Sequence, residues 1–168
     1  ESSLAEVEKI LVAGLGRFNP KLSFRPVAQK KRALILVTKE SHCLRDLLYL
    51  QELGELPIEI PAVVSNHGDL RALTESHSIK FIDQSGADKQ ASESQIRKLI
   101  TEEKIDLIIL ARYMQVLSSE FCNDFAGKII NIHHSFLPGF KGAKPYHQAH
   151  DHGVKIIGAT AHFVTKDL

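Results

Sequence analysis

The hydrophobic positions of the chain form two kinds of pattern, short continuous apolar runs and longer segments with helical spacing. The runs at 33–37 and 106–110 are typical of strands that are buried on both faces of a sheet. Further strands are predicted at 22–25, 60–64, 81–82, 128–132 and 154–164. Helical spacing predicts helices at 4–18, 43–53, 69–77, 92–103 (capped by Ser92), 118–125 and 146–152. This alternation predicts a doubly wound, mostly parallel α/β sheet of the Rossmann-like class.

The carboxyl ends of the predicted strands are the places where a ligand is expected. In open parallel sheets, ligands bind outside these ends of the strands. The rule selects the segments 38–42, 65–67, 111–115 and 133–142 as candidate site segments. The first 30 or so residues lie outside the alternating pattern.

Composition narrows the function classes. The chain is 43% hydrophobic, and its 21 basic and 20 acidic residues give a net charge of +1. Such a balance gives no strong field for nucleic acid or an anionic membrane, and no apolar run approaches the ~20 residues of a membrane span. Cys43 and Cys122 have no disulfide or zinc spacing, so free thiols in a reducing compartment, the cytoplasm, are expected.

Histidine is distributed unevenly, and one pair of residues stands out. Six of the nine histidines lie between His133 and His162. Asn131 and His133 are two apart on a predicted strand, so both side chains leave the same face at its carboxyl end. There they could both donate to one developing oxyanion, and the imidazole could move a proton. The alternative is that both side chains only bond the backbone of the following loop.

Two other kinds of site are disfavoured. The segment 38–43, Thr-Lys-Glu-Ser-His-Cys, is too bulky for a glycine-rich phosphate cradle. His147 and His150 have a spacing that zinc can use, but no Cys or Glu stands at ligand spacing from them. We therefore expect no metal.

Three long motifs carry a family resemblance. They are Asn-Ile-His-His-Ser-Phe-Leu-Pro at 131–138, Gly-Ala-Lys-Pro-Tyr-His-Gln-Ala at 142–149 and Gly-Ala-Thr-Ala-His-Phe-Val at 158–164. Together with the segments at 36–43 and 110–118, they resemble the formyltransferase fold family from about residue 33 onward. The resemblance implies a formyltransferase-fold catalytic domain at 32–168. It also implies that residues 1–31 are the end of an ACT-like α+β regulatory domain plus a linker.

The resemblance also implies roles for single residues. Asn131 and His133 would polarise the formyl oxygen of 10-formyltetrahydrofolate, and His162 would position a catalytic carboxylate. The folate would be a substrate, with no cofactor required. The residues expected to bind it are Met114, Gln115, Val116, Leu117 and Gly142. The carboxylate itself is expected one residue beyond Leu168, so the catalytic domain is expected to be incomplete in these 168 residues.

The resemblance leaves three functions to compare. Hydrolysis of 10-formyltetrahydrofolate would supply formate for purine synthesis and balance the folate pool. Formyl transfer to glycinamide ribonucleotide is the first alternative, but His134 stands where those enzymes have Pro, and the phosphate cradle is missing. A folate-binding module without catalysis is the second. A homo-oligomer and a small-molecule regulator of the N-terminal part are expected from the resemblance alone.

Overall fold

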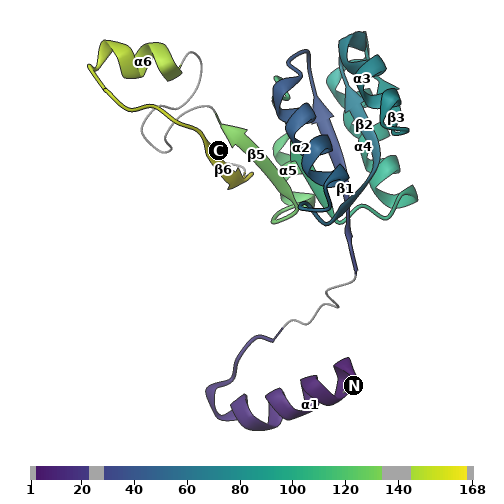
Figure 1. Ribbon diagram of the computed structural model, residues 1–168, viewed down its shortest axis with the longest axis vertical. Coiled ribbons are helices and arrows are strands. Elements are labelled where there is room, and N and C mark those ends of the chain that lie inside the picture. The colour runs from purple at the N-terminus through teal and green to yellow at the C-terminus, as the bar shows by residue number, and fades with distance from the viewer. Residues whose placement is uncertain (1–2, 23–28, 134–144, 166–168) are drawn as a thin grey trace. The chain divides into compact units, whose positions relative to one another are not determined.

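The chain divides into two compact units, Glu1–Lys30 and Lys31–Leu168. The computed structural model describes residues 3–22, 29–133 and 145–165 (Figure 1). In the first unit, helix α1 (Leu4–Leu15) continues into a 3₁₀ turn, η1 (Gly16–Phe18). Ser3 and Glu6 begin α1 with reciprocal bonds between side chain and backbone. The helix is confirmed, whereas the strand predicted at 22–25 falls largely outside the described residues and the ACT-like assignment stays a prediction.

The second unit is built on a six-stranded sheet of order β3-β2-β1-β4-β5-β6. The strands are β1 (Lys31–Val37), β2 (Ile58–Ser65), β3 (Lys80–Asp83), β4 (Leu107–Leu110), β5 (Ile129–His133) and β6 (Thr160–Phe163). Every neighbouring pair is parallel except β5 and β6, which are antiparallel. The predicted mostly parallel α/β sheet is therefore confirmed.

The core lies on both faces of this sheet. Strand β1 is central, and its residues 33–37 are fully buried, as its continuous apolar run requires. Leu34 and Leu36 pack into the cluster that contains Phe121, while Ile35 and Val37 pack into the opposite cluster. The helices are α2 (His42–Glu52), α3 (Arg71–Ser76, after the 3₁₀ turn η2, Gly68–Leu70), α4 (Lys89–Glu102), α5 (Ser119–Asp124) and α6 (Pro145–Asp151).

Three predicted boundaries are wrong. Helix α4 begins at Lys89, because the Asp88 carboxylate caps it by accepting from the Ala91 N–H at 2.7 Å; Ser92 is not the cap. Strand β1 begins at Lys31, where a linker was expected, because Arg32 binds carboxylates of two neighbouring segments. Strand β6 covers only Thr160–Phe163 of the predicted 154–164. Its partner β5 pairs with it only over these four residues, and 154–159 have no ladder.

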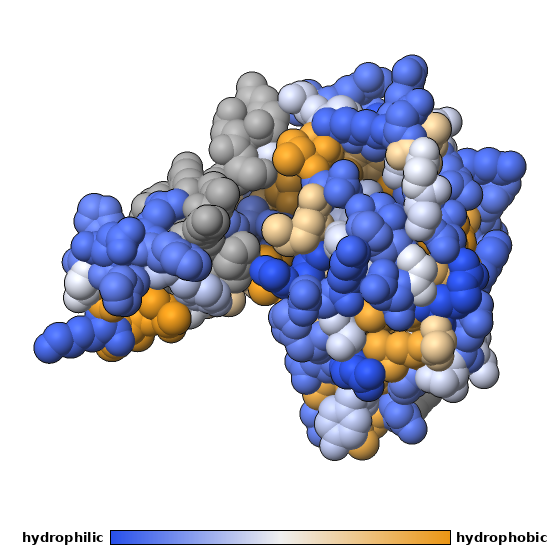
Figure 2. Space-filling view, turned by 90° about the horizontal axis from the view of Figure 1, so that it is seen from above, coloured by the Kyte–Doolittle hydropathy of each residue, from blue (hydrophilic) through white to orange (hydrophobic). Residues whose placement is uncertain are grey.

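The face of the molecule shown in Figure 2 is mostly hydrophilic, with small hydrophobic patches between hydrophilic residues. Ile156 and Ile157 are exposed in the stretch before β6. Within the described ranges, no helix is long and apolar enough to cross a membrane.

Candidate functional site

The carboxyl ends of three parallel strands are joined by side-chain hydrogen bonds. Thr38 follows β1 and is only 9% exposed. Its carbonyl accepts from the Ser65 hydroxyl at the end of β2, at 3.0 Å. Its own hydroxyl oxygen accepts from the Met114 N–H, beyond β4, at 2.9 Å. The chain that follows β4 is therefore fixed to the strands beside it.

The segment 113–117, which we call the wall segment, begins after an unusual backbone turn. Arg112 has a φ of 59°, in the left-handed region that costs a residue with a side chain ~1–3 kcal/mol. At the other end stands Ser118, the N-cap of α5. Its N–H and hydroxyl both donate to the Glu93 carboxylate, at 2.6 and 2.5 Å. The wall segment is thus held from β1 at one end and from α4 at the other.

A cavity of about 360 Å³ lies against the wall segment. Small-molecule sites in proteins start at ~300 Å³, so the cavity can accommodate the ring system of a ligand. Three of the predicted folate-binding residues line it, together with the predicted catalytic Asn131. The full lining is Leu110, Tyr113, Gln115, Val116, Leu117, Ser119, Cys122, Asn131, Val164 and Thr165.

Met114 plays a different part from its neighbours. Its side chain is 57% exposed and does not line the cavity, although a substrate-binding role was predicted for it. Its backbone N–H instead anchors the wall segment to Thr38. Gly142, the remaining predicted binding residue, lies outside the described residues, as does everything after Thr165.

The predicted catalytic side chains come together across β5 and β6. Asn131 is paired with His162, and His133 with Thr160, so these residues share one face of the two strands. The Asn131 Nδ2 lies 3.4 Å from the His162 Nε2. The His162 Nδ1 lies 3.1 Å from the Phe163 carbonyl oxygen, which can only accept. The Phe163 carbonyl fits a ring with its proton on Nδ1, so that Nε2 accepts from the Asn131 amide; among the described residues, the second N–H of that amide has no further partner.

Two residues to which the sequence assigned no role give this cavity its chemical character, although Tyr113 lies in the candidate segment 111–115. Burial raises the pKa of the Tyr113 hydroxyl, and the nearby Glu93 carboxylate raises it further, although a bond with Ser92 opposes this. Burial, followed by the Glu93 charge, also raises the pKa of the Cys122 thiol. Cys122 lies one helical turn after Ser118, the N-cap of α5, and this spacing is the one signal in the sequence from which its place near the wall segment could have been predicted.

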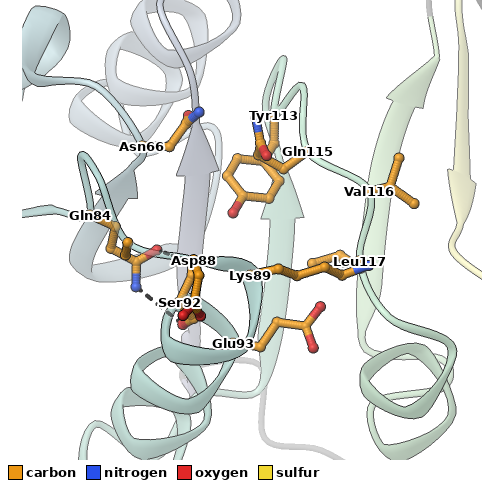
Figure 3. A pocket seen from close by; sticks show the side chains of 11 residues that line it. Asn66, Gln84, Asp88, Lys89, Ser92, Glu93, Tyr113, Gln115, Val116 and Leu117 are labelled. Carbon is orange, nitrogen blue, oxygen red and sulfur yellow. Dashed lines mark hydrogen bonds between the residues drawn. The ribbon is translucent and has the colours of Figure 1, made fainter.

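A second cavity, of about 50 Å³, lies on the other side of the wall segment (Figure 3). Tyr113, Gln115, Val116 and Leu117 line both cavities. The opposite side is polar, and Gln84 there accepts from the Ser92 hydroxyl at 2.5 Å. At ~10–15 Å³ for a water molecule, the space can hold ordered water. The described residues contain no group of three His, Cys, Asp or Glu side chains that could hold a metal ion.

Comparison with known proteins identifies the family. A family model described as formyl transferase matches residues 31–168, which is the whole second unit. The chain belongs to the formyl transferase family. The resemblance of the three sequence motifs is confirmed, and so is the formyltransferase fold.

The similar proteins include two kinds of enzyme, formyltetrahydrofolate deformylases and phosphoribosylglycinamide formyltransferases. Formyltetrahydrofolate deformylase of Corynebacterium sp. (strain P-1) is 49% identical over 154 residues, 90% of this chain and 54% of that protein. The crystal structure of the deformylase from Pseudomonas syringae pv. tomato is 41% identical with a TM-score of 0.88, covering 99% of this chain and 57% of the other. Phosphoribosylglycinamide formyltransferase from Brucella melitensis is 33% identical with a TM-score of 0.74, over 83% of this chain and 75% of the other. The chain spans about half the length of the curated relatives it matches.

Proposed function

We propose that this chain carries most of the catalytic domain of an enzyme that hydrolyses 10-formyltetrahydrofolate to formate and tetrahydrofolate. The main support is the cavity that brings Asn131 together with Gln115, Val116 and Leu117. Relatives named formyltetrahydrofolate deformylase, at up to 49% identity, add to it. In this proposal the pterin ring lies against the wall segment and the formyl group faces β5.

The reaction needs stabilisation of a tetrahedral intermediate and control of two protons. Water attacks the formyl carbon, and the carbonyl oxygen becomes an oxyanion that accepts from the Asn131 amide and the His133 imidazole. The bond between carbon and N10 then breaks, and His133 donates the proton that the departing nitrogen takes. The carboxylate expected one residue beyond Leu168 would take a proton from the attacking water. His162 would position this carboxylate by contact with its ring, because both ring nitrogens already have partners, the Asn131 amide and the Phe163 carbonyl.

Formyl transfer to glycinamide ribonucleotide is the competing function. The chain after β1 reads Thr-Lys-Glu-Ser-His-Cys at 38–43, without the glycines of a phosphate cradle. The phosphoribosylglycinamide formyltransferase from Brucella melitensis is also less similar to this chain than the Corynebacterium deformylase is, at 33% against 49% identity. These observations favour water over a phosphorylated acceptor.

Formate release by the natural full-length protein tests the proposal. We expect turnover of 10-formyltetrahydrofolate in buffer alone, and losses of about 10²–10³-fold in Asn131→Ala and His133→Ala. If both variants keep the wild-type kcat, the assigned roles are wrong. Glycinamide ribonucleotide that raises formyl consumption far above the rate in water would favour the transferase. Tetrahydrofolate binding without any turnover would favour a binding module.

Several accompanying statements stay predictions. We propose that the folate is a substrate and that no cofactor takes part. The two free cysteines, Cys43 and Cys122, suit a cytoplasmic location. A role in supplying formate for purine synthesis, a homo-oligomeric state and a small-molecule regulator of the N-terminal unit also stay predictions.

A further inference from the structure

We infer that Thr38 and Glu93 are positioning residues that hold the wall segment, and so set the affinity of the cavity for the folate. Thr38 begins the candidate segment 38–42 selected from the sequence, but the two hydrogen-bonded contacts to the wall segment were not predicted. Thr38 does not line the 360 Å³ cavity, and neither does Glu93. The inference rests on the proposed function for the identity of the ligand, but the tethers themselves do not depend on it.

The backbone conformation and the packing of the wall segment do not by themselves hold it in one position. It starts after a residue with a left-handed backbone, Arg112 at φ 59°, which persists only where the surroundings determine the conformation. It also lies between two cavities, with Tyr113, Gln115, Val116 and Leu117 lining both. Since there is space on each side, packing alone does not fix its position.

The first tether acts at the start of the segment. Thr38 is nearly buried, and the Ser65 hydroxyl, itself fully buried, donates to its carbonyl. The Thr38 hydroxyl oxygen then accepts from the Met114 N–H at 2.9 Å. The loop residue Met114 is therefore held in a fixed position relative to the core strands β1 and β2 by the Thr38 hydroxyl oxygen.

The second tether acts at the end of the segment and carries a charge. Glu93 accepts from both the N–H and the hydroxyl of Ser118, at 2.6 and 2.5 Å. Bonds to an ionised acceptor are shorter and about twice as strong as neutral ones. The Ser118 hydroxyl also accepts from the Phe121 N–H at 3.1 Å, so Glu93 orients the start of α5 together with the end of the wall segment. The Glu93 side chain lines the small cavity (Figure 3), into which the wall segment could shift once this bond is lost.

Pairs of substitutions at each position distinguish the loss of a tethering hydrogen bond from a general loss of structure. Thr38→Val removes the acceptor and keeps the shape, while Thr38→Ser keeps the hydroxyl. Glu93→Ala removes both bonds, while Glu93→Gln keeps an amide that can accept from the Ser118 N–H and donate to its hydroxyl. Glu102→Ala is the matched control, because Glu102 lies on the same helix in an exposed ion pair with Lys98.

Two measurements test the inference in the natural full-length protein. The first is amide hydrogen exchange of the peptide that contains residues 113–118. The second is the split between kcat and KM for 10-formyltetrahydrofolate, with the Kd of tetrahydrofolate as an independent probe. We expect Thr38→Val and Glu93→Ala to speed the exchange and to raise KM and Kd about tenfold, the effect of 1.4 kcal/mol, with kcat within about threefold. Thr38→Ser and Glu102→Ala should stay close to the wild type, and Glu93→Gln, which keeps two weaker neutral bonds, should lie between the wild type and Glu93→Ala.

Either of two results overturns the inference. One is an unchanged exchange rate over 113–118 in Thr38→Val and Glu93→Ala. The other is faster exchange with an unchanged KM and Kd, or a loss confined to kcat. The proposed function fails in a different way, if the wild-type protein releases no formate. The hydrogen-exchange comparison does not depend on turnover, so it tests the tethers in either case.

Discussion

The contact between Asn131 and His162 allows a quantitative prediction about the proposed oxyanion site. We consider Asn131→Ala, His162→Ala and the double variant. In the wild type, the neutral His162 imidazole accepts from the Asn131 amide across β5 and β6 at 3.4 Å. That bond fixes the rotation of the amide, and therefore the direction of its second N–H.

The structure sets different magnitudes for the two effects. Loss of an oxyanion donor costs about 10²–10³-fold in kcat, or ~2.7–4 kcal/mol, so Asn131→Ala should fall in this range. A hydrogen bond between neutral groups is worth ~0.5–1.5 kcal/mol, and 3.4 Å is long for one. The coupling between Asn131 and His162 should therefore be ~0.5–1 kcal/mol, or about two- to fivefold in rate.

A double-mutant cycle on formate release measures this coupling directly. The kcat/KM of the four proteins is compared at one pH with the natural full-length protein. His162→Ala alone also reports the proposed support of the carboxylate, but that part cancels in the cycle. We expect the double variant to be about two- to fivefold faster than the product of the two single losses predicts.

Two outcomes would refute this reasoning. If the losses multiply fully, the 3.4 Å contact does not orient the amide in the working enzyme. If Asn131→Ala costs less than about tenfold, the amide is not the main oxyanion donor, whatever the coupling.

Three further predictions follow from the surroundings of single side chains. In a Cys43→Ser variant, Cys122 should react slowly with iodoacetamide, because burial raises the pKa of its thiol. Bound tetrahydrofolate should slow the reaction further, because Cys122 lines the cavity proposed to bind it. Labelling at the rate of a free thiol would contradict this. The pKa of Asp83 is held below its ordinary value of 3.8, chiefly by a Ser85 hydrogen bond, so its stabilisation is present at neutral pH and is lost as the pH falls through the folded value. Urea unfolding should show this acid-dependent loss in the wild type but not in Asp83→Asn. Phe121→Ala, at a fully buried core position, should lower the free energy of unfolding by ~3–5 kcal/mol in the same assay, and a loss below ~1 kcal/mol would mean that the site can collapse.

Local patterns were enough to predict the sheet and one part of the site. A few neighbouring residues were sufficient in both cases. The apolar run at 33–37 predicts a buried strand, and the two-residue spacing of Asn131 and His133 predicts side chains on one face of a strand. Element boundaries were less predictable, since the length of β6 depends on its partner β5, and Asp88 competes with Ser92 for the start of α4.

The tethers of the wall segment could not be predicted in the same way. Thr38 and Met114 are 76 positions apart, and Glu93 and Ser118 are 25 apart. Each pair meets only because β1 and β4 are neighbours in the sheet and α4 packs against one face of it. A Thr after a strand or a Glu on a helix gives no signal of such a partner in a single sequence.

The outermost strands bear on how copies of this unit can associate. Strand β3 forms one border of the sheet and has only four residues, with Lys80 and Asp83 exposed at its two ends. A short edge strand with charged side chains is a poor template for pairing with another strand, and folded proteins use such edges to prevent their sheets from pairing edge to edge. Any self-assembly of the second unit should therefore spare β3, and aromatic residues placed at 80 and 83 should make this protein prone to fibrous aggregation.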